Sequence, residues 1–138
     1  MTPEAMAALA ARAYRHGTAW SATAFADTLA RPEALLGLSG DAAFALGLVI
    51  ADEAEILAVA CDPTQQRQGH AARALAQLHA AATGRGAGTV FLEVAAGNAS
   101  AIAFYARHGY VVTGRRRGYY RTPDGGREDA LLMVRALP

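Results

Sequence analysis

Residues 66–71, Gln-Arg-Gln-Gly-His-Ala, lie where an apolar segment ends and an alanine-rich segment with helical spacing begins. The first turn of a helix has backbone N–H groups without partners, and the helix dipole adds partial positive charge there. Gly69 would let the backbone approach a ligand, and the small Ala71 keeps the helix entrance open. The segment is therefore predicted to bind a phosphate or pyrophosphate. An ordinary strand-to-helix loop is the alternative.

Glu93 is a candidate general base. It stands in the β-rich segment 89–94, where alternation separates it from the apolar face that carries Val90 and Leu92. Partial burial of a carboxylate favours its protonated form, which suits proton acceptance near neutral pH. The alternatives are an edge position that faces solvent, or an ion pair with one of the arginines at 115–117.

Tyr105 is a candidate general acid, because a phenol can donate its proton. It lies on a helix predicted over residues 99–108, and Asn98 is the expected N-cap of that helix. Core packing is the alternative, since Tyr105 follows Ile102 at helical spacing.

These side chains need a scaffold, and the sequence predicts its elements in order. Apolar periodicity and stop signals place helices over residues 3–16, 22–29, 71–82 and 99–108, with Gly17 ending the first. Strands are predicted over residues 34–38, 43–51, 55–61, 89–94, 110–113 and 129–136, with a basic, tyrosine-bearing loop before the last. This order predicts an α/β fold with a mixed, mostly antiparallel central sheet and helices on both faces. Ligands in such sheets bind beyond the carboxyl ends of strands.

The composition fits a single domain over residues 1–138, with 53% hydrophobic and 18% charged residues. The 13 basic and 12 acidic residues leave a net charge of +1, which argues against a protein that mainly binds nucleic acid or an acidic membrane. No apolar run approaches the roughly 20 residues that span a bilayer. The N-terminal residues do not resemble a signal peptide, and the single cysteine, Cys61, cannot form an internal disulfide. A cytoplasmic location is expected.

No metal is expected. The four histidines, His16, His70, His79 and His108, show no metal-ligand spacing with the carboxylates or with Cys61.

The spacing Gln66-x-x-Gly69-x-Ala71 resembles the Gln/Arg-x-x-Gly-x-Gly/Ala segment that binds the pyrophosphate of acetyl-CoA in the GNAT acetyltransferases. The stretch from Leu92 to Tyr105, followed by Gly109-Tyr110, resembles the Glu-Val…Asn-x-x-Ala-Ile-x-x-Tyr…Gly-Phe segment of the same superfamily. Residues 115–120 and 124–130 are similar to the RimI-like branch, the N-terminal alanine acetyltransferases of bacterial ribosomal proteins. The resemblance covers residues 59–134.

The resemblance implies acetyl-CoA as co-substrate and direct transfer in a ternary complex. It implies that Glu93 removes the amine proton through water and that Tyr105 protonates the departing thiolate. It also implies a CoA site formed by Val59, Ala60 and Cys61 along pantetheine, by Arg67, Gln68, Gly69, His70, Ala71 and Ala72 at the pyrophosphate, and by Asn98 at the pantetheine amides. His70 departs from the small or aliphatic residue that is common at its position, and it could face solvent or touch a phosphate.

The expected acceptor is the N-terminal α-amine, on alanine, of a protein such as a ribosomal protein. The alternatives are a small-molecule amine, a lysine side chain, a CoA-binding regulatory module without catalysis, and an RNA-associated factor. The presence of both Glu93 and Tyr105 argues against the regulatory module. The arginine run at 115–117 could be a solvated hairpin, a wall of the substrate groove or a docking patch for RNA or acidic protein. No oligomeric state is predicted.

Overall fold

The computed structural model of the protein describes residues 1–14 and 19–138. Its centre is a six-stranded sheet in the order β1-β2-β3-β4-β6-β5. All neighbouring strands in it are antiparallel except β3 and β4. The strands are β1 (Ala34–Ser39), β2 (Ala43–Ile50), β3 (Glu53–Cys61), β4 (Thr89–Ala95), β5 (Val111–Arg121) and β6 (Arg127–Ala136). The helices are α1 (Pro3–Ala13), α2 (Ala22–Leu29), α3 (His70–Gly84) and α4 (Ala99–Arg107), with a short 3-10 turn, η1 (Pro63–Gln65).

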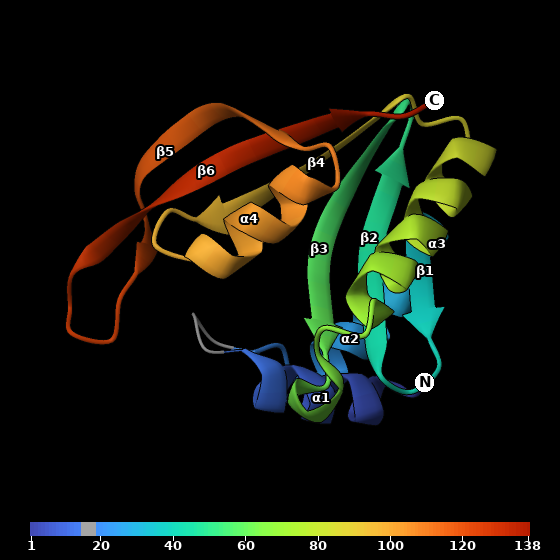
Figure 1. The fold of residues 1–138 in the computed structure, drawn as a ribbon, viewed down its shortest axis with the longest axis horizontal. Coiled ribbons are helices and arrows are strands. Elements are labelled where there is room, and N and C mark those ends of the chain that lie inside the picture. The colour runs from blue at the N-terminus through green and yellow to red at the C-terminus, as the bar shows by residue number, and fades with distance from the viewer. Residues whose placement is uncertain (15–18) are drawn as a thin grey trace.

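Helices cover both faces of this sheet (Figure 1). On one face, Leu75 and Leu78 of α3 and Tyr105 of α4 share a buried core with residues of β2, β3 and β4. On the other face, α1 and α2 bury Met6 and Phe25 in a second core with residues of β2 and β3. The predicted mixed α/β fold is confirmed. None of the described helices is long and apolar enough to cross a membrane.

Three predicted helix starts are confirmed by their caps. The side chains of Thr2 and Ser21 accept hydrogen bonds from the backbone N–H groups of Ala5 and Ala24, at 3.0 and 3.1 Å. Asn98 accepts one from Ala101 at 3.3 Å. Each bond satisfies a backbone N–H that the helix itself leaves without a partner.

Several helix boundaries differ from the prediction, and α4 ends one residue earlier than expected, at Arg107. Helix α1 ends at Ala13, and the predicted stop at Gly17 lies outside the described residues. Helix α3 begins at His70, one residue earlier than expected, and continues through Gly84. Boundary residues carry little periodic signal, so shifts of this size are ordinary.

The predicted basic loop after residue 113 is wrong. Residues 114–121 continue strand β5, which pairs along β6 with Arg116 opposite Ala130. The strand lies at the edge of the sheet and is exposed along most of its length, so its sequence lacks the alternation of a half-buried strand. Asp129 holds it in place, because its carboxylate accepts the Gly118 N–H at 2.8 Å and pairs with Arg115 at 2.6 Å.

The sheet opens between its two parallel strands. Strands β3 and β4 pair only from Glu53–Thr89 to Glu55–Phe91 and then diverge, as Figure 1 shows. A bulge at Leu57 lies just beyond this point, because Gly47 faces Ile56 while Leu46 faces Ala58. An extra residue reverses which side chains face which side of the sheet.

The contacts of the two hydrophobic cores show this reversal in the side chains of β3. Ile56 packs in the core of α3, whereas Ala58, two residues later, packs in the core of α1 and α2. From the bulge onward, Val59 and Cys61 face the side of α3.

Candidate active site

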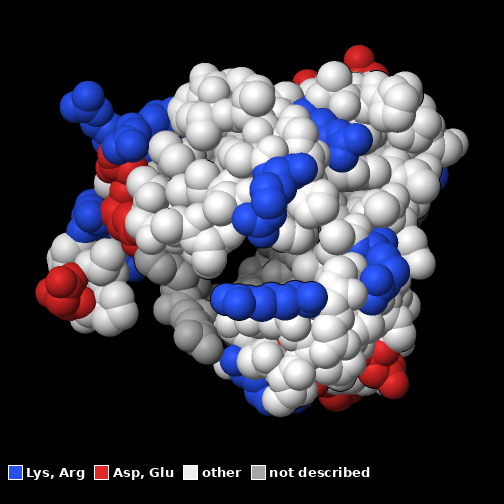
Figure 2. All heavy atoms as spheres, viewed as in Figure 1, with Lys and Arg blue, Asp and Glu red and all other residues white. Residues whose placement is uncertain are grey.

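A groove of about 1610 Å³ occupies the space between the diverging strands. It is lined by β3 from Ile56 to Cys61, by β4 from Leu92 to Ala95, by the first part of α4, and by the hairpin after β5. In the orientation of Figure 1, the molecule is hollowed near its centre, with arginine side chains at the rim of the hollow (Figure 2). The groove brings Glu93, Tyr105, Asn98 and the backbone of residues 59–61 together.

The loop at the start of α3 has the backbone shape of an anion site. Arg67 and Gly69 have φ angles of 66° and 81°. The helix start at Gly69 has no side-chain cap, and in the first turn the Ala71 N–H bonds to the Cys61 sulfur. Arg67 and Ala71 line the groove at this end.

The His70 side chain makes two polar contacts with other side chains. Its Nδ1 lies 2.8 Å from the hydroxyl of Ser39 and 2.9 Å from Nη2 of Arg73. His70 can therefore contribute to the loop through its backbone N–H, while its ring packs toward the end of β1.

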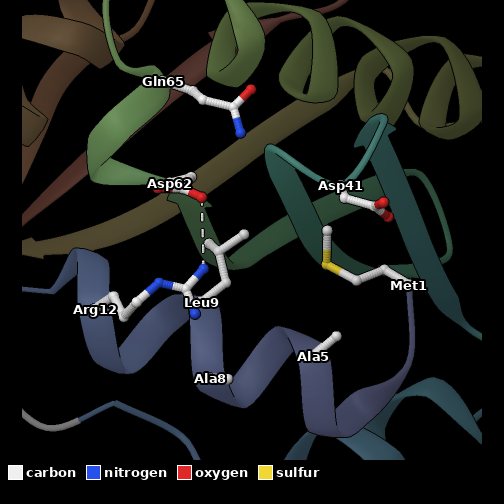
Figure 3. Close-up of a pocket in the computed structure, with 8 residues that line it drawn as sticks. All are labelled: Met1, Ala5, Ala8, Leu9, Arg12, Asp41, Asp62 and Gln65. Atoms are coloured by element: carbon white, nitrogen blue, oxygen red, sulfur yellow. Dashed lines mark ion pairs between the residues drawn. The ribbon is translucent and has the colours of Figure 1, made fainter.

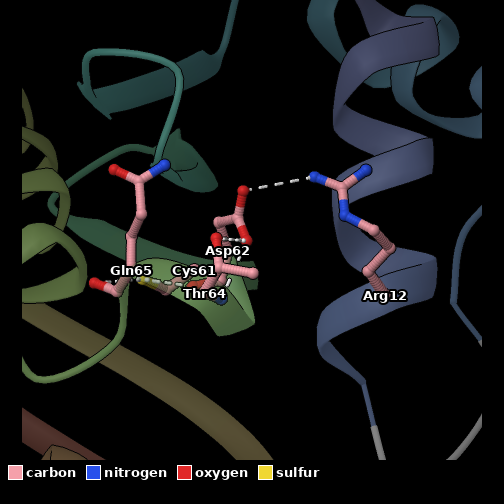
Figure 4. A network of polar contacts seen from close by, with 5 residues as sticks. All are labelled: Arg12, Cys61, Asp62, Thr64 and Gln65. Carbon is pink, nitrogen blue, oxygen red and sulfur yellow. Dashed lines mark hydrogen bonds and ion pairs between the residues drawn. The ribbon is translucent and has the colours of Figure 1, made fainter.

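The turn that precedes this loop is fixed by Asp62. Its Oδ1 accepts hydrogen bonds from the N–H and the hydroxyl of Thr64 at 2.9 and 2.8 Å, and its Oδ2 pairs with Arg12 at 3.6 Å (Figure 4). These contacts hold the pKa of the Asp62 carboxyl below its usual value, the Thr64 N–H contributing most. A hollow of about 320 Å³ between α1 and this turn is lined by Met1, Ala5, Ala8, Leu9, Arg12, Asp41, Asp62 and Gln65 (Figure 3).

Cys61 is not an activated nucleophile. Its thiol lies 3.6 Å from the carbonyl oxygen of Asp62 and 3.9 Å from that of Gln65. Burial, followed by the Asp62 charge, raises the pKa of the thiol, so it stays protonated near neutral pH.

Glu93 faces the groove from β4, as the alternation predicted. One carboxylate oxygen lies 3.3 Å from Nη2 of Arg116, so the ion-pair alternative also holds. The other oxygen is buried and has no hydrogen-bond partner among the described residues. Arg116 itself lies over the ring of Tyr119, 5.0 Å from its centroid.

The Glu93 charge affects two neighbouring titratable groups. Burial raises the pKa of Glu55, on the neighbouring strand, and the Glu93 charge raises it further. Burial and then the Glu93 charge also raise the pKa of Tyr120.

Tyr105 is both packed and part of the groove. Its residue surface is 8% exposed, and its ring meets that of Tyr110 edge-on at a centroid distance of 5.5 Å. Burial, and to a lesser degree Tyr14 and Tyr110, raises the pKa of Tyr105 above that of an ordinary tyrosine. The phenol therefore keeps its proton at neutral pH.

Asn98 stands where α4 begins, on the wall of the groove. Its capping bond uses the amide oxygen, which leaves the NH₂ group free of the cap. The preceding Gly97 donates its N–H to Glu128 Oε1 at 2.7 Å, which ties this turn to β6.

Several residues in or near the groove have no sequence pattern that would identify them as site residues. Tyr14 and Trp20, from the N-terminal part of the chain, line the groove, and burial raises the pKa of Tyr14 to about 12. Away from the groove, His79 lies 2.6 Å from the Tyr110 hydroxyl and 3.1 Å from Nη1 of Arg135.

Among the described residues, no group of three or more His, Cys, Asp or Glu could hold a metal ion.

Residues 5–110, most of the chain, match the model of the Acetyltransferase (GNAT) family. The chain therefore belongs to the GNAT family of N-acetyltransferases, which use acetyl-CoA.

Individual proteins with similar sequences are also acetyltransferases. The ribosomal protein bS18-alanine N-acetyltransferase of Escherichia coli strain K12 is 41% identical over 126 residues, 89% of this chain and 83% of that protein. The enzyme of the same name from Haemophilus ducreyi is 38% identical over 92 residues, 67% of this chain and 63% of that protein.

Solved structures share the fold. The crystal structure of the E. coli ribosomal-protein-S18-alanine N-acetyltransferase superposes with a TM-score of 0.83 at 38% identity, covering 98% of this chain and 87% of that one. Ard1 from Thermoplasma volcanium reaches a TM-score of 0.81 at 23% identity, covering 100% and 95%, and this second likeness concerns the fold alone.

Proposed function

We propose that this protein transfers an acetyl group from acetyl-CoA to the N-terminal α-amine of a protein, with alanine as the first residue and a ribosomal protein as the substrate. The observation that carries the proposal is the position of Glu93 and Tyr105 on the walls of one groove. The identity to relatives named ribosomal protein bS18-alanine N-acetyltransferase supports the choice of acceptor. Such a substrate agrees with a cytoplasmic location.

The groove suits CoA at both of its ends. The start of α3 has no side-chain cap, and Gly69 adopts the αL conformation there, so we place the phosphate at this helix N-terminus. Beyond Glu55, the edge of β3 is not paired with β4 in the described register, so the backbone of residues 59–61 can pair with the pantetheine amides. Asn98 would donate its NH₂ group to the same arm of the ligand. Bound acetyl-CoA would supply an activated acetyl group as a thioester.

The acceptor amine must lose a proton before it attacks. At pH 7 this costs roughly 1 kcal/mol for an α-amine but about 4–5 kcal/mol for a lysine side chain. We assign Glu93 as the base, acting through water. Its side chain lines the groove and is 18% exposed, so a water molecule in the groove can carry the amine proton to the carboxylate.

The C–N bond forms as the C–S bond breaks, and the sulfur leaves as a thiolate that needs a proton. Tyr105 holds one at neutral pH, as tyrosines generally do, and its side chain lies on the wall of the groove. We assign it as the general acid, with the proton moving from its hydroxyl to the sulfur. Because burial raises the pKa of the Cys61 thiol, we assign no acyl-enzyme to it and propose direct transfer.

Two matched peptides test the proposal. One carries a free N-terminal alanine and no lysine, and the other has a blocked N-terminus and a single internal lysine. We expect CoA release with the first only, and mass spectrometry to place the acetyl group on its α-amine. The enzyme contains no lysine of its own, so any acetyl-lysine in the assay comes from the peptide. Reaction of the lysine peptide alone would overturn the proposed acceptor.

A further inference from the structure

Arg73, in the first turn of α3, is absent from the predicted site yet makes three contacts around the loop that precedes the helix. Its Nε donates to the Ser39 hydroxyl at 3.2 Å, and its Nη2 donates to the carbonyl of Gln68 at 3.0 Å. The same Nη2 lies 2.9 Å from Nδ1 of His70. Because a guanidinium can only donate, this contact requires the His70 tautomer that carries its proton on Nε2.

These contacts form a closed cluster, because the Ser39 hydroxyl also lies 2.8 Å from His70 Nδ1. The cluster connects the end of β1, the first turn of α3 and the loop carbonyl of Gln68. Arg73 does not line the groove, whereas Gln66, Arg67 and Ala71 do. The guanidinium therefore holds the loop from the side of β1.

The bond to Gln68 has a consequence for the next residue. In a trans peptide, the C=O and the following N–H point in opposite directions. With the Gln68 carbonyl turned toward Arg73, the Gly69 N–H points away from it. Gly69, at φ 81°, could otherwise allow this peptide to rotate and present the carbonyl oxygen to an anion.

We propose that Arg73 is a positioning residue for the pyrophosphate loop, fixing the Gln68–Gly69 peptide so that the Gly69 N–H is available to the ligand. This inference rests on the proposed use of acetyl-CoA. It adds a residue that contacts the loop and not the reacting atoms. Ser39 supports Arg73 in this role by holding its Nε.

Calorimetric binding of CoA and of pantetheine tests the inference without any acceptor, since pantetheine lacks the pyrophosphate. Arg73→Met is expected to weaken CoA binding about three- to tenfold, the range for losing one or two hydrogen bonds, and to leave pantetheine within about twofold. Ser39→Ala removes no charge and is expected to weaken CoA about twofold. Arg107→Met removes the same charge from an exposed position at the end of α4 and is the matched control.

Dephospho-CoA separates positioning from general attraction between charges. It keeps the pyrophosphate but carries less negative charge, so a positioning role predicts the same fold loss as for CoA. Equal weakening of pantetheine, unchanged CoA binding by Arg73→Met, or an equal loss in Arg107→Met would overturn the inference. Failure of the unsubstituted enzyme to bind CoA would instead overturn the proposed function, and the inference with it.

Discussion

Arg116 lies 3.3 Å from Glu93, and this ion pair joins the edge strand β5 to the carboxylate that we assign as the base. The Arg116 side chain is 62% exposed and that of Glu93 is 18% exposed. An exposed pair of this kind contributes little to folding, about 1 kcal/mol or less. Its effect on catalysis is expected to be larger, because the Arg116 guanidinium holds one oxygen of the carboxylate that we assign as the base.

Arg116→Met is therefore expected to lower kcat with an N-terminal alanine peptide about three- to tenfold, because the carboxylate loses the contact that holds it in place. The measurement is kcat, expressed as a ratio to the unsubstituted enzyme. Arg117→Met is the control, since it removes the neighbouring charge but not the pair with Glu93. Equal losses of kcat in the two variants would contradict a role for the ion pair in positioning the base.

Tyr105→Phe and Tyr110→Phe make the same chemical change in two rings that touch. We expect Tyr105→Phe to lower kcat about 100-fold, within the range for losing a general acid, without weakening acetyl-CoA binding. Tyr110→Phe removes the hydroxyl bonded to His79 and is expected to cost about 1 kcal/mol of stability with little change in kcat. Steady-state kinetics and thermal unfolding separate the two effects. Similar losses of kcat in both variants would indicate a packing role for Tyr105.

His79 gives the fold a predictable dependence on pH. Burial, and then the charge of Arg135, lowers its pKa from 6.5 to about 4. The unfolded chain therefore takes up a proton between these values while the folded protein does not, so stability rises with pH across this window. We expect Tm to fall as the pH is lowered from 7 to 5, a range above the titration of ordinary carboxylates.

His79→Gln should reduce this slope. Part of the pH dependence of stability will remain, because burial also lowers the pKa of His108 and so also makes stability rise with pH. Unfolding of both proteins, followed by circular dichroism at several pH values, is the measurement. Equal slopes would show that His79 does not account for the pH dependence.

Gly69→Ala tests whether the loop before α3 binds CoA, with Gly125→Ala in the β5–β6 turn as the matched control. Gly69 and Gly125 have φ angles of 81° and 85°, so alanine strains the backbone at both, by about 1–2 kcal/mol. At Gly69 the new Cβ would lie 3.0 Å from Arg73 Nη1, whereas at Gly125 it would meet nothing within 4 Å. We expect both variants to lose stability but only Gly69→Ala to weaken CoA binding in calorimetry. Unchanged CoA affinity in Gly69→Ala would contradict binding at this loop.

Much of the fold follows from local signals. Side-chain caps at Thr2, Ser21 and Asn98 mark helix starts, and alternation in β4 places Glu93 opposite the buried Val90 and Leu92. These features depend on residues close in sequence, which is why spacing predicts them. The single-domain organisation and the catalytic roles stay predictions.

Other features depend on contacts that no local pattern encodes. The sheet places β6 between β4 and β5, and the extended β5 is stabilised by that pairing rather than by its own alternation. Arg73 contacts Ser39, which lies 34 residues away in the sequence. Helical spacing predicts only that Arg73 lies on the exposed face of its helix, so it gives no hint of this contact. Tyr14 and Trp20 enter the groove because the N-terminal part of the chain packs beside it.

We assign Glu93 as the base for transfer to an α-amine, and kcat of Glu93→Gln with an N-terminal alanine peptide tests this role most directly. Glu55→Gln, the same change on the adjacent strand, is the control. We predict that Glu93→Gln lowers kcat at least about 100-fold at pH 7 while acetyl-CoA affinity and Tm stay unchanged, and that Glu55→Gln retains most activity. A Glu93→Gln enzyme with near-normal kcat, or an equal loss in Glu55→Gln, would contradict this assignment.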